Sequence, residues 1–182
     1  MRRFLSKSQP PFDRVLLIES GSRTLFEEVL SGFYDAHPDS RADLVTCYAG
    51  LPRHFRPENG QIYRVSEYQG AKARRSLYAE LKSNRYSIIV IICSAEPIMT
   101  KWKWMLAARV PAKLIILNEN CDYFWADRGH LTQIWQFTLA RAGLHGAGAV
   151  RTIARIVLFP FALLYLILFA ATVHLRRKLR TL

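Results

Sequence analysis

Cysteine is scarce in this sequence, and no group of side chains has the spacing of a metal site. The three cysteines, Cys47, Cys93 and Cys121, are an odd number without a short metal-binding spacing, and the histidines are scattered. These absences exclude a disulfide-stapled scaffold and a zinc-binding domain, so we expect no metal centre. Cys47 and Cys93 end apolar runs, where a free cysteine behaves as a small hydrophobic residue.

Phosphate-binding signatures are missing as well. The chain contains no G-x-G-x-x-G turn and no P-loop, which are the fingerprints of dinucleotide and nucleoside triphosphate sites. We therefore expect no cofactor. No order of Ser, His and Asp residues supports a catalytic triad. Residues 1–13 include basic residues but no apolar stretch, so we expect no secretory signal.

Acidic residues are absent from the C-terminal part of the chain. After Asp127 there are eight basic residues and no acid, whereas residues 1–127 hold 18 basic and 14 acidic residues. Most of the net charge of +12 therefore lies around the apolar segment described next, where it suits anionic lipid headgroups. Nucleic acid is the other usual partner of a basic chain, but no nucleic-acid-binding motif accompanies the charge, so we expect none.

One long apolar run is present near the C-terminus. Residues 156–175 read IVLFPFALLYLILFAATVHL, without Asp, Glu, Lys or Arg. A helix of about 20 residues spans about 30 Å, the thickness of the hydrocarbon core of a bilayer. The alternative is a buried core helix, but core helices of small domains are usually shorter and keep a polar stripe. The run therefore predicts one transmembrane helix in contact with a lipid bilayer.

Basic and aromatic residues predict where the chain meets the membrane surface. Basic side chains beside an apolar helix extend toward the headgroups, and tryptophan prefers the same region. The predicted interface residues are Arg151, Arg155, Arg176, Arg177 and Lys178 beside the apolar run, and Trp102 and Trp104 in the KWKW run. For the two tryptophans, packing on the sheet with the lysines solvated is an open alternative.

The topology of the apolar run has two interpretations. Without a secretory signal, the soluble part is expected to stay in the cytoplasm, at the inner membrane. A spanning helix then places the basic tail 176–182 outside, against the positive-inside tendency. Pro160 could instead bend the helix so that both ends stay cytoplasmic. We favour the spanning helix, and both interpretations keep the soluble domain on the cytoplasmic surface.

The residues before the apolar run predict one α/β domain. Short apolar stretches alternate with amphipathic stretches, which is typical of a parallel sheet with helices between its strands. The expected strands are 14–19, 42–47, 61–66, 86–93 and 112–118, and the expected helices are 23–36, 71–84, 97–109 and 131–142. This pattern predicts a Rossmann-like parallel sheet of about five strands with flanking helices, followed by the transmembrane helix. The expected parts are an extension 1–13, the Rossmann-like domain 14–142, a basic glycine-containing link 143–155, the membrane helix 156–175 and the basic tail 176–182.

Polar residues that follow the expected strands form the candidate site, because ligands of such sheets lie outside the carboxyl ends of the strands. After the first strand, a glycine-containing turn leads into a helix whose free N–H groups can hold an anion or a sugar. Glu19 is a candidate catalytic group there, and Ser20, Gly21 and Ser22 are candidate substrate ligands. Ser22 is equally suited to cap the helix.

Two later turns offer further carboxylates. Glu96 follows the fourth strand and suits a general base, although a glutamate at a helix start is also favoured by the helix dipole. The run 118–125 combines acids and amides with aromatics, a composition seen in sugar sites, but its aromatics could equally rest on the membrane interface. Its candidate catalytic group is Glu119, and its candidate substrate ligands are Asn118, Asn120 and Asp122.

Two stretches of the chain resemble a known family. The first reads FDRVLLIESGSRTLFEEVLSGFYDAHPDSRADLVT, and the second reads LYAELKSNRYSIIVIICSAEP. They resemble the N-terminal, acceptor-side half of ADP-heptose:lipopolysaccharide heptosyltransferases and related GT-B glycosyltransferases, over residues 12–117. That family carries an acidic residue just after the glycine of the first turn, and this residue looks catalytic. The chain has Ser22 at that place, so the base implied by the resemblance would be Glu19, Glu96 or another group.

The family also has a second Rossmann domain that holds the nucleotide-sugar, and this chain ends in an apolar segment instead. The dolichol-pathway N-acetylglucosaminyltransferase is similar in architecture, because its membrane-anchored Rossmann subunit recruits a soluble donor-binding subunit. The resemblance thus implies a membrane-anchored, glycosyltransferase-like protein, a split or accessory half acting on envelope glycolipids or polysaccharide with a donor-binding protein partner. A non-catalytic subunit of a larger membrane complex is the alternative, which leaves enzyme activity open.

Overall fold

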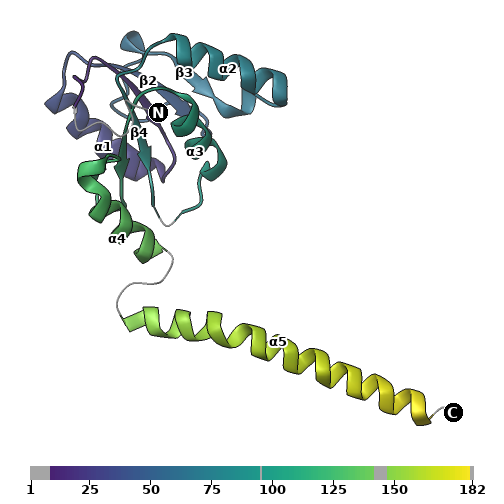
Figure 1. Cartoon of the computed structure of the whole chain (residues 1–182). Helices are drawn as coiled ribbons and strands as arrows, with labels where there is room; N and C mark the ends of the chain where they lie inside the picture. Colours follow the sequence, from purple (N-terminus) through teal and green to yellow (C-terminus); the bar gives the residue numbers. More distant parts are fainter. Residues whose placement is uncertain (1–8, 95, 142–146, 181–182) are drawn as a thin grey trace. The chain divides into compact units, whose positions relative to one another are not determined.

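The computed structural model describes residues 9–94, 96–141 and 147–180. The chain divides into two units, Met1–Leu131 and Thr132–Leu182. The described part of the first unit is a mixed α/β domain, and that of the second unit is helical (Figure 1). The predicted end of the soluble domain at residue 142 falls outside the described residues.

Strands and helices alternate through the first unit. The strands are β1 (Arg14–Ile18), β2 (Arg41–Thr46), β3 (Ile62–Arg64), β4 (Ile88–Ile92), β5 (Lys113–Leu117) and β6 (Tyr123–Trp125). The helices are α1 (Arg23–Ala36), α2 (Ala71–Ser83) and α3 (Thr100–Arg109), with short 3₁₀ helices at Pro57–Asn59, Val65–Glu67 and Arg128–His130. The alternation that the sequence predicts is confirmed, with element ends that differ by a few residues.

The sheet has six strands, in the order β3-β2-β1-β4-β5-β6. The first five are parallel, as predicted, and β6 pairs antiparallel with β5. The sequence predicts about five strands and a loop over 118–125, and β6 corrects both expectations. Tyr123, Phe124 and Trp125 are aromatic residues that favour strands, and the turn before them returns the chain alongside β5.

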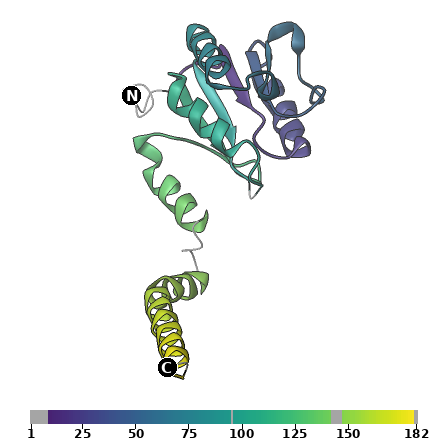
Figure 2. The same cartoon turned by 90° about the vertical axis from the view of Figure 1, so that its right-hand side faces the viewer.

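Helices cover both faces of the sheet. The chain reverses its direction across the sheet between β3 and β4, so right-handed crossovers place α1 on one face and α2 and α3 on the other (Figure 2). On the first face, Phe26, Leu30 and Tyr34 recur every four residues along α1 and pack on the hydrophobic core. On the second face, Leu77 of α2 and Leu106 of α3 are fully buried.

A buried polar cluster ties together the amino ends of the strands. Asp43 Oδ2 accepts a hydrogen bond from the Tyr86 hydroxyl and lies 3.3 Å from Arg14 Nη2, while Asp43 Oδ1 accepts one from the Gln61 backbone N–H at 2.8 Å. Burial raises the pKa of Tyr86, and the hydrogen bond to Asp43 raises it further. Both oxygens of the Asp43 carboxylate are thus bound by groups of the protein itself. The cluster therefore joins neighbouring strands and does not offer a ligand site.

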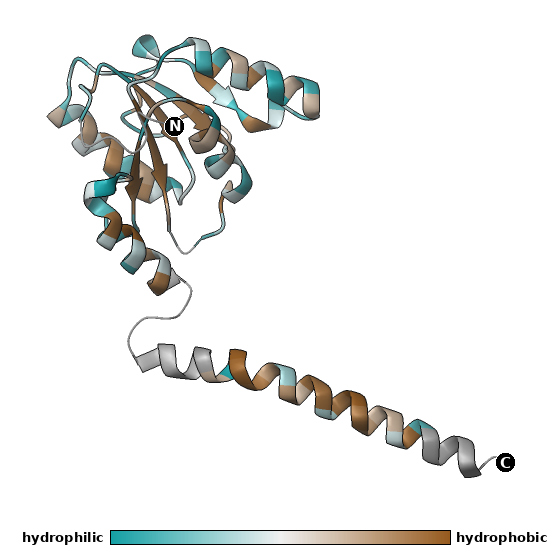
Figure 3. Ribbon diagram, viewed as in Figure 1, coloured by the Kyte–Doolittle hydropathy of each residue, from teal (hydrophilic) through white to brown (hydrophobic). Residues whose placement is uncertain are grey.

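The second unit contains α4 (Leu131–Arg141) except for its first residue, and all of α5 (Ala147–Arg180). Within α5, Ala154–His174 is long and apolar enough to cross a membrane (Figure 3). The helix continues through Pro160 without a break, so the chain does not turn back there. Because α5 begins at Ala147, the predicted link 143–155 is helical from that residue onward, and the basic tail is helical as far as Arg180.

Candidate functional site

The direction of the strand order reverses between β1 and β4, and this position defines the candidate site. From β1 the chain moves outward to β2 and β3, and it then returns to β4 on the other side of β1. In open α/β sheets, ligands bind outside the carboxyl ends of the strands at such a reversal. We therefore define the switch-point edge as the residues at the carboxyl ends of β1, β2 and β4 and just after them, namely 19–23, 46–48 and Cys93, Ser94 and Glu96.

Glu19 is the buried centre of the switch-point edge. Its side chain has no exposed surface, and Thr46 Oγ1 at the end of β2 donates a hydrogen bond to Glu19 Oε2. Arg23 Nε and Glu19 Oε1 form an ion pair at 2.6 Å, although the N–H group does not point at the oxygen as in a hydrogen bond. Arg23 Nη2 donates a hydrogen bond to Glu19 Oε2 at 3.3 Å. Burial raises the pKa of Glu19, and Thr46 and Arg23 only partly oppose it. The predicted catalytic carboxyl is thus enclosed by protein groups in this structure.

Ser20 and Gly21 join the end of β1 to the end of β4. Ser20 Oγ donates to the backbone oxygen of Ile92 at 2.9 Å and accepts from its N–H at 3.0 Å. A Cβ atom on Gly21 would lie 2.6 Å from Ile92 Cγ2, so only glycine lets the chain pass this close to β4. Two of the predicted substrate ligands therefore have a structural role in the described arrangement.

Arg23 presents a positive charge at the start of α1. Its side chain keeps 24% of its surface exposed although one side is bound to Glu19. Its guanidinium group lies over the Tyr48 ring, 5.0 Å from the ring centroid, and the Tyr48 hydroxyl donates to the Gly21 oxygen at 3.1 Å. Ser22 precedes α1 without a side-chain cap, and the first turn contains no acid. The positive end of the helix and the fixed guanidinium together favour an anionic group at this edge.

A lysine and a hydroxyl approach the same edge from α3 and from the end of β4. Lys103 is 5% exposed, and its Nζ donates to the Ile92 oxygen at 2.9 Å, the same oxygen that binds Ser20. Ser94 Oγ is buried and has no hydrogen-bond partner among the described residues. Glu96, two residues farther, is exposed. Of the three predicted catalytic carboxylates, Glu96 is the one that is exposed and also lies in the segment after a strand at the reversal, four residues beyond the end of β4.

The turn between β5 and β6 is held by its own side chains. Asn118 Oδ1 accepts hydrogen bonds from the backbone N–H groups of Asn120 and Asp122, both at 2.9 Å, and Asn118 Nδ2 donates to Asp122 Oδ2 at 3.1 Å. Glu119 lies in this turn and is exposed. The side chains of Asn118 and Asp122, two of the three predicted substrate ligands in this turn, therefore close a hairpin, as asparagine does in many turns, and Asn120 contributes its backbone N–H.

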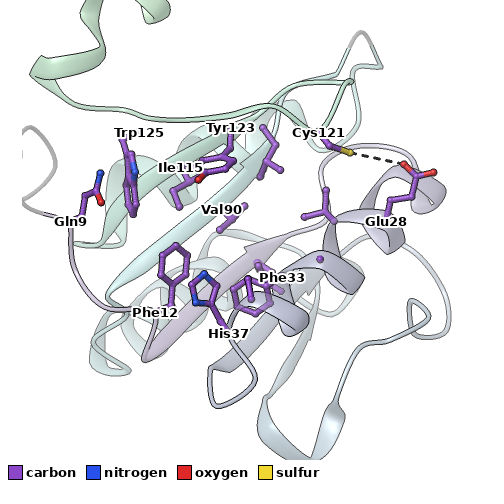
Figure 4. Close-up of a pocket in the computed structure, with 15 residues that line it drawn as sticks. Gln9, Phe12, Glu28, Phe33, His37, Val90, Ile115, Cys121, Tyr123 and Trp125 are labelled. Carbon is purple, nitrogen blue, oxygen red and sulfur yellow. Dashed lines mark hydrogen bonds between the residues drawn. The ribbon is translucent and has the colours of Figure 1, made fainter.

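An apolar groove lies on the α1 face of the sheet (Figure 4). Its volume is about 520 Å³, within the usual range for small-molecule sites. Phe12, Phe33 and His37 form one wall, and Tyr123 and Trp125 stand opposite them. The Phe12 and His37 rings stack at 3.9 Å between centroids. The residues nearest one end are Cys121 and Glu28, whose Sγ and Oε2 atoms are 4.0 Å apart.

The predicted membrane-interface residues have different surroundings. Trp102 is half-buried, with its ring 6.2 Å from that of Tyr78, whereas Trp104 is 44% exposed. Arg155 is exposed. The side chains of the other four lie outside the described residues; these are Arg151, Arg176, Arg177 and Lys178.

Sequence reasoning missed Arg23, Thr46 and Tyr48 of the switch-point edge, and it missed Lys103 of α3, which approaches this edge. Two of them carry a signal in the sequence. Arg23 is four residues after Glu19, and Thr46 ends the strand next to β1, so a parallel sheet brings it to the same edge. Comparison with known proteins finds no matching family model, no matching curated protein and no similar solved structure. The geometry alone therefore has to support a function.

Proposed function

We propose that this chain is a membrane-anchored, glycosyltransferase-like protein, a split or accessory half that acts in the synthesis of envelope glycolipids or polysaccharide. The observation that carries the proposal is the Glu19–Arg23 pair at the reversal of a Rossmann-like sheet, where it holds a partly exposed cation. The same chain carries an apolar stretch, Ala154–His174, long enough to cross a membrane. An anion-binding edge and a membrane helix suit a substrate that joins a phosphate to a lipid.

In this proposal the residues of the switch-point edge have separate roles. Arg23 binds the anionic group of a lipid-linked acceptor, and Glu19 is a positioning residue that fixes the guanidinium from behind. Glu96 is the general base, which takes the proton of the acceptor hydroxyl. The oxygen of that hydroxyl attacks the anomeric carbon of the donor sugar, and the nucleotide departs as the leaving group. Glu119, exposed in the β5–β6 turn, is the second candidate for that base.

The donor sugar requires a partner in this proposal. The resemblance covers the acceptor-side half of a two-domain transferase, and we propose that a protein partner holds the nucleotide-sugar. The membrane helix keeps the soluble unit at the cytoplasmic face of the inner membrane, where lipid-linked acceptors are present. Arg155 and Trp104, both exposed, are proposed to contact the lipid headgroups.

The first test is to purify the tagged full chain from its native membranes in a mild detergent and to identify what accompanies it by mass spectrometry. The expected companions are a soluble glycosyltransferase-type protein and a polyprenyl lipid. Sugar transfer to lipid is then measured with the purified complex. Glu96→Gln is expected to lower the rate about 100-fold or more, as loss of a general base usually does.

The matched control is Glu58→Gln, an exposed glutamate in the 3₁₀ helix Pro57–Asn59, which should leave the transfer rate unchanged. Equal rates for the wild type, Glu96→Gln and Glu119→Gln would remove direct catalysis from the proposal. An accompanying set of integral-membrane proteins without a transferase or a glycolipid would overturn the glycosyltransferase assignment.

A non-catalytic subunit of a larger membrane complex is the second candidate, and a separate observation favours it. The apolar groove on the α1 face is open, and Tyr123 on its wall is 66% exposed. Exposed aromatic residues around a concave apolar surface are typical of protein interfaces. In this case the same purification yields a stoichiometric set of membrane subunits, and Glu96→Gln has no effect on their function.

A further inference from the structure

Helices α2 and α3 form one continuous outer surface on the face of the sheet opposite α1. Three contacts of Tyr78 in α2 join them. Its ring lies 6.2 Å from that of Trp102, its hydroxyl is 4.0 Å from Met105 Sδ, and the Arg109 guanidinium lies over its ring at 4.4 Å from the centroid. The side chains on either side of this seam therefore share one surface.

The exposed charges of this surface are almost all positive. Helix α3 has no acid, and the acid in α2 is Glu80, whose carboxylate accepts a hydrogen bond from the Tyr63 hydroxyl at 3.1 Å. The exposed basic residues of the two helices, and of the residue that closes the turn after α2, are Lys72, Arg74, Arg75, Lys82, Arg85, Lys101 and Arg109.

Helical spacing gathers part of this charge beside an exposed tryptophan. Arg75 and Lys82 are three residues before and four residues after Tyr78, so they lie on the side of α2 that meets α3. Lys101 and Trp104 are three residues apart on α3, and Trp104 is 44% exposed. We name Arg75, Lys82, Lys101, Trp104 and Arg109 the α2–α3 basic surface.

We infer that the α2–α3 basic surface docks the soluble unit onto a bilayer that contains anionic lipids. Its basic side chains complement phosphate headgroups, and the indole of Trp104 suits the boundary between headgroups and acyl chains. The inference rests on the proposed membrane anchoring. A helix that holds the soluble unit near the lipid raises its effective concentration there, so a few weak contacts suffice.

Docking through this surface has a consequence for both proposed functions. The apolar groove and α1 lie on the opposite face of the sheet, so they point away from the lipid and stay open to a protein partner. The switch-point edge lies at the rim between the two faces, where it can receive a headgroup from the bilayer. Docking thus orients the unit without blocking either candidate site.

The test uses the full chain in nanodiscs, either of brominated phosphatidylcholine alone or with about one third phosphatidylglycerol added. Bromine on the upper acyl chain quenches a nearby indole, and the Trp104 contribution is the difference from a Trp104→Phe variant. The expected result is that quenching of Trp104 rises about twofold or more in the anionic discs and falls again at high salt. The charge-reversal variant Arg75→Glu/Lys82→Glu/Lys101→Glu should lose this rise.

The matched control reverses three exposed arginines elsewhere in the soluble unit, Arg41→Glu/Arg53→Glu/Arg128→Glu, and should keep the rise. Equal circular dichroism spectra and equal thermal unfolding of the two triple variants check that both are folded.

If the protein enters the discs but the quenching of Trp104 does not depend on lipid charge, the docking surface is overturned and the anchoring is not. Failure to enter any disc overturns the anchoring, and the docking inference with it. If the wild type binds single-stranded RNA, the charge-reversal variant Arg75→Glu/Lys82→Glu/Lys101→Glu does not, and quenching does not depend on lipid charge, the surface binds nucleic acid and the inference is overturned.

Discussion

Glu19 Oε1 and Arg23 Nε lie 2.6 Å apart, on residues four positions apart in the segment that leads from the end of β1 to the start of α1. The acid is fully buried and the base is partly exposed. The pair therefore fixes a cation at the switch-point edge, with its anion held out of solvent. The pKa of Glu19 is nevertheless raised, which means that burial disfavours its charge more than its partners favour it.

This imbalance predicts a pH dependence for Glu19→Gln. The folded-state pKa of Glu19 lies above its usual value of 4.5, so the folded protein binds this proton more tightly than the unfolded chain does. The stability that Glu19 contributes is thus fully present below pH 4.5 and is lost as pH rises through the raised pKa. Relative to Glu19→Gln, the wild type should become less stable between acidic and neutral pH. Urea unfolding of the full chain in detergent, followed by tryptophan fluorescence, measures the difference.

The exposed glutamate variant Glu58→Gln is the control, and its difference from wild type should not follow this trend. If Glu19→Gln lost more stability at neutral than at acidic pH, the Arg23 attraction would outweigh burial and the argument would be wrong. A variant that is stable but transfers no sugar would fit a positioning role, because such residues are often kept at a cost in stability.

Parts of this arrangement could be predicted from the sequence, and parts could not. Strands β1, β4 and β5 come from strongly apolar runs, and such runs have the composition of buried strands whatever their partners. The three residues of β6 form a strand only because β5 lies beside them, so local pattern does not reveal it. The surroundings of Glu19 depend on Thr46, 27 residues away. A parallel sheet places both residues at the same edge, but the sequence does not show that Thr46 Oγ1 donates a hydrogen bond to the Glu19 carboxyl group.

A second prediction concerns the close passage of Gly21 over β4. In Gly21→Ala the new Cβ would lie 2.6 Å from Ile92 Cγ2, so the chain or the side chain has to shift. We expect a loss of about 1–3 kcal/mol in the free energy of unfolding, the usual cost of overpacking. Ile92→Ala removes the obstructing methyl group, and the double variant should lose less than the two single losses added together. Additive losses would mean that the obstruction is elsewhere.

Gly32 provides the opposite case in α1. A Cβ atom at this position meets nothing within 4 Å, and glycine lowers helix stability because of its backbone freedom. Gly32→Ala should therefore raise the free energy of unfolding by up to about 1 kcal/mol. The same residue lines the apolar groove, so Gly32→Trp should also displace any partner that occupies the groove. A partner that remains bound to Gly32→Trp would show that it does not use this surface.

The buried ion pair of Lys113 and Asp127 supports the next prediction. Nζ and Oδ2 are 3.2 Å apart, and both side chains are 3% exposed. Burial alone would raise the pKa of Asp127, but hydrogen bonds from His130, Lys113 and the Gly129 N–H lower it to about 2. Asp127→Asn takes away the carboxylate that faces the Lys113 charge and should cost about 3–5 kcal/mol in unfolding free energy.

The pH dependence of this pair has the opposite sign to that of Glu19. A lowered pKa means that the contribution of Asp127 is present above its usual value of 3.8 and is lost as pH falls toward about 2. The stability difference between wild type and Asp127→Asn should therefore shrink in that interval. The exposed variant Asp39→Asn should change stability by less than about 0.5 kcal/mol. An equally small loss for Asp127→Asn would mean that the pair does not stabilise the fold.

The last prediction tests whether α5 anchors the chain in a membrane. Leu164 lies near the middle of the apolar stretch Ala154–His174. Leu164→Arg places a charge near the middle of the apolar run, at a cost of about 2.5–3.5 kcal/mol for insertion, and Leu164→Arg/Leu168→Arg doubles the charge. Alkaline carbonate extraction of membranes should leave the wild type in the pellet and release the double variant. Leu164→Ile/Leu168→Ile, which keeps the run apolar, should stay in the pellet. Leu164 and Leu168 are 55% and 57% exposed. Unchanged extraction of the double arginine variant would mean that α5 serves as an exposed helix for a protein partner instead of a lipid anchor.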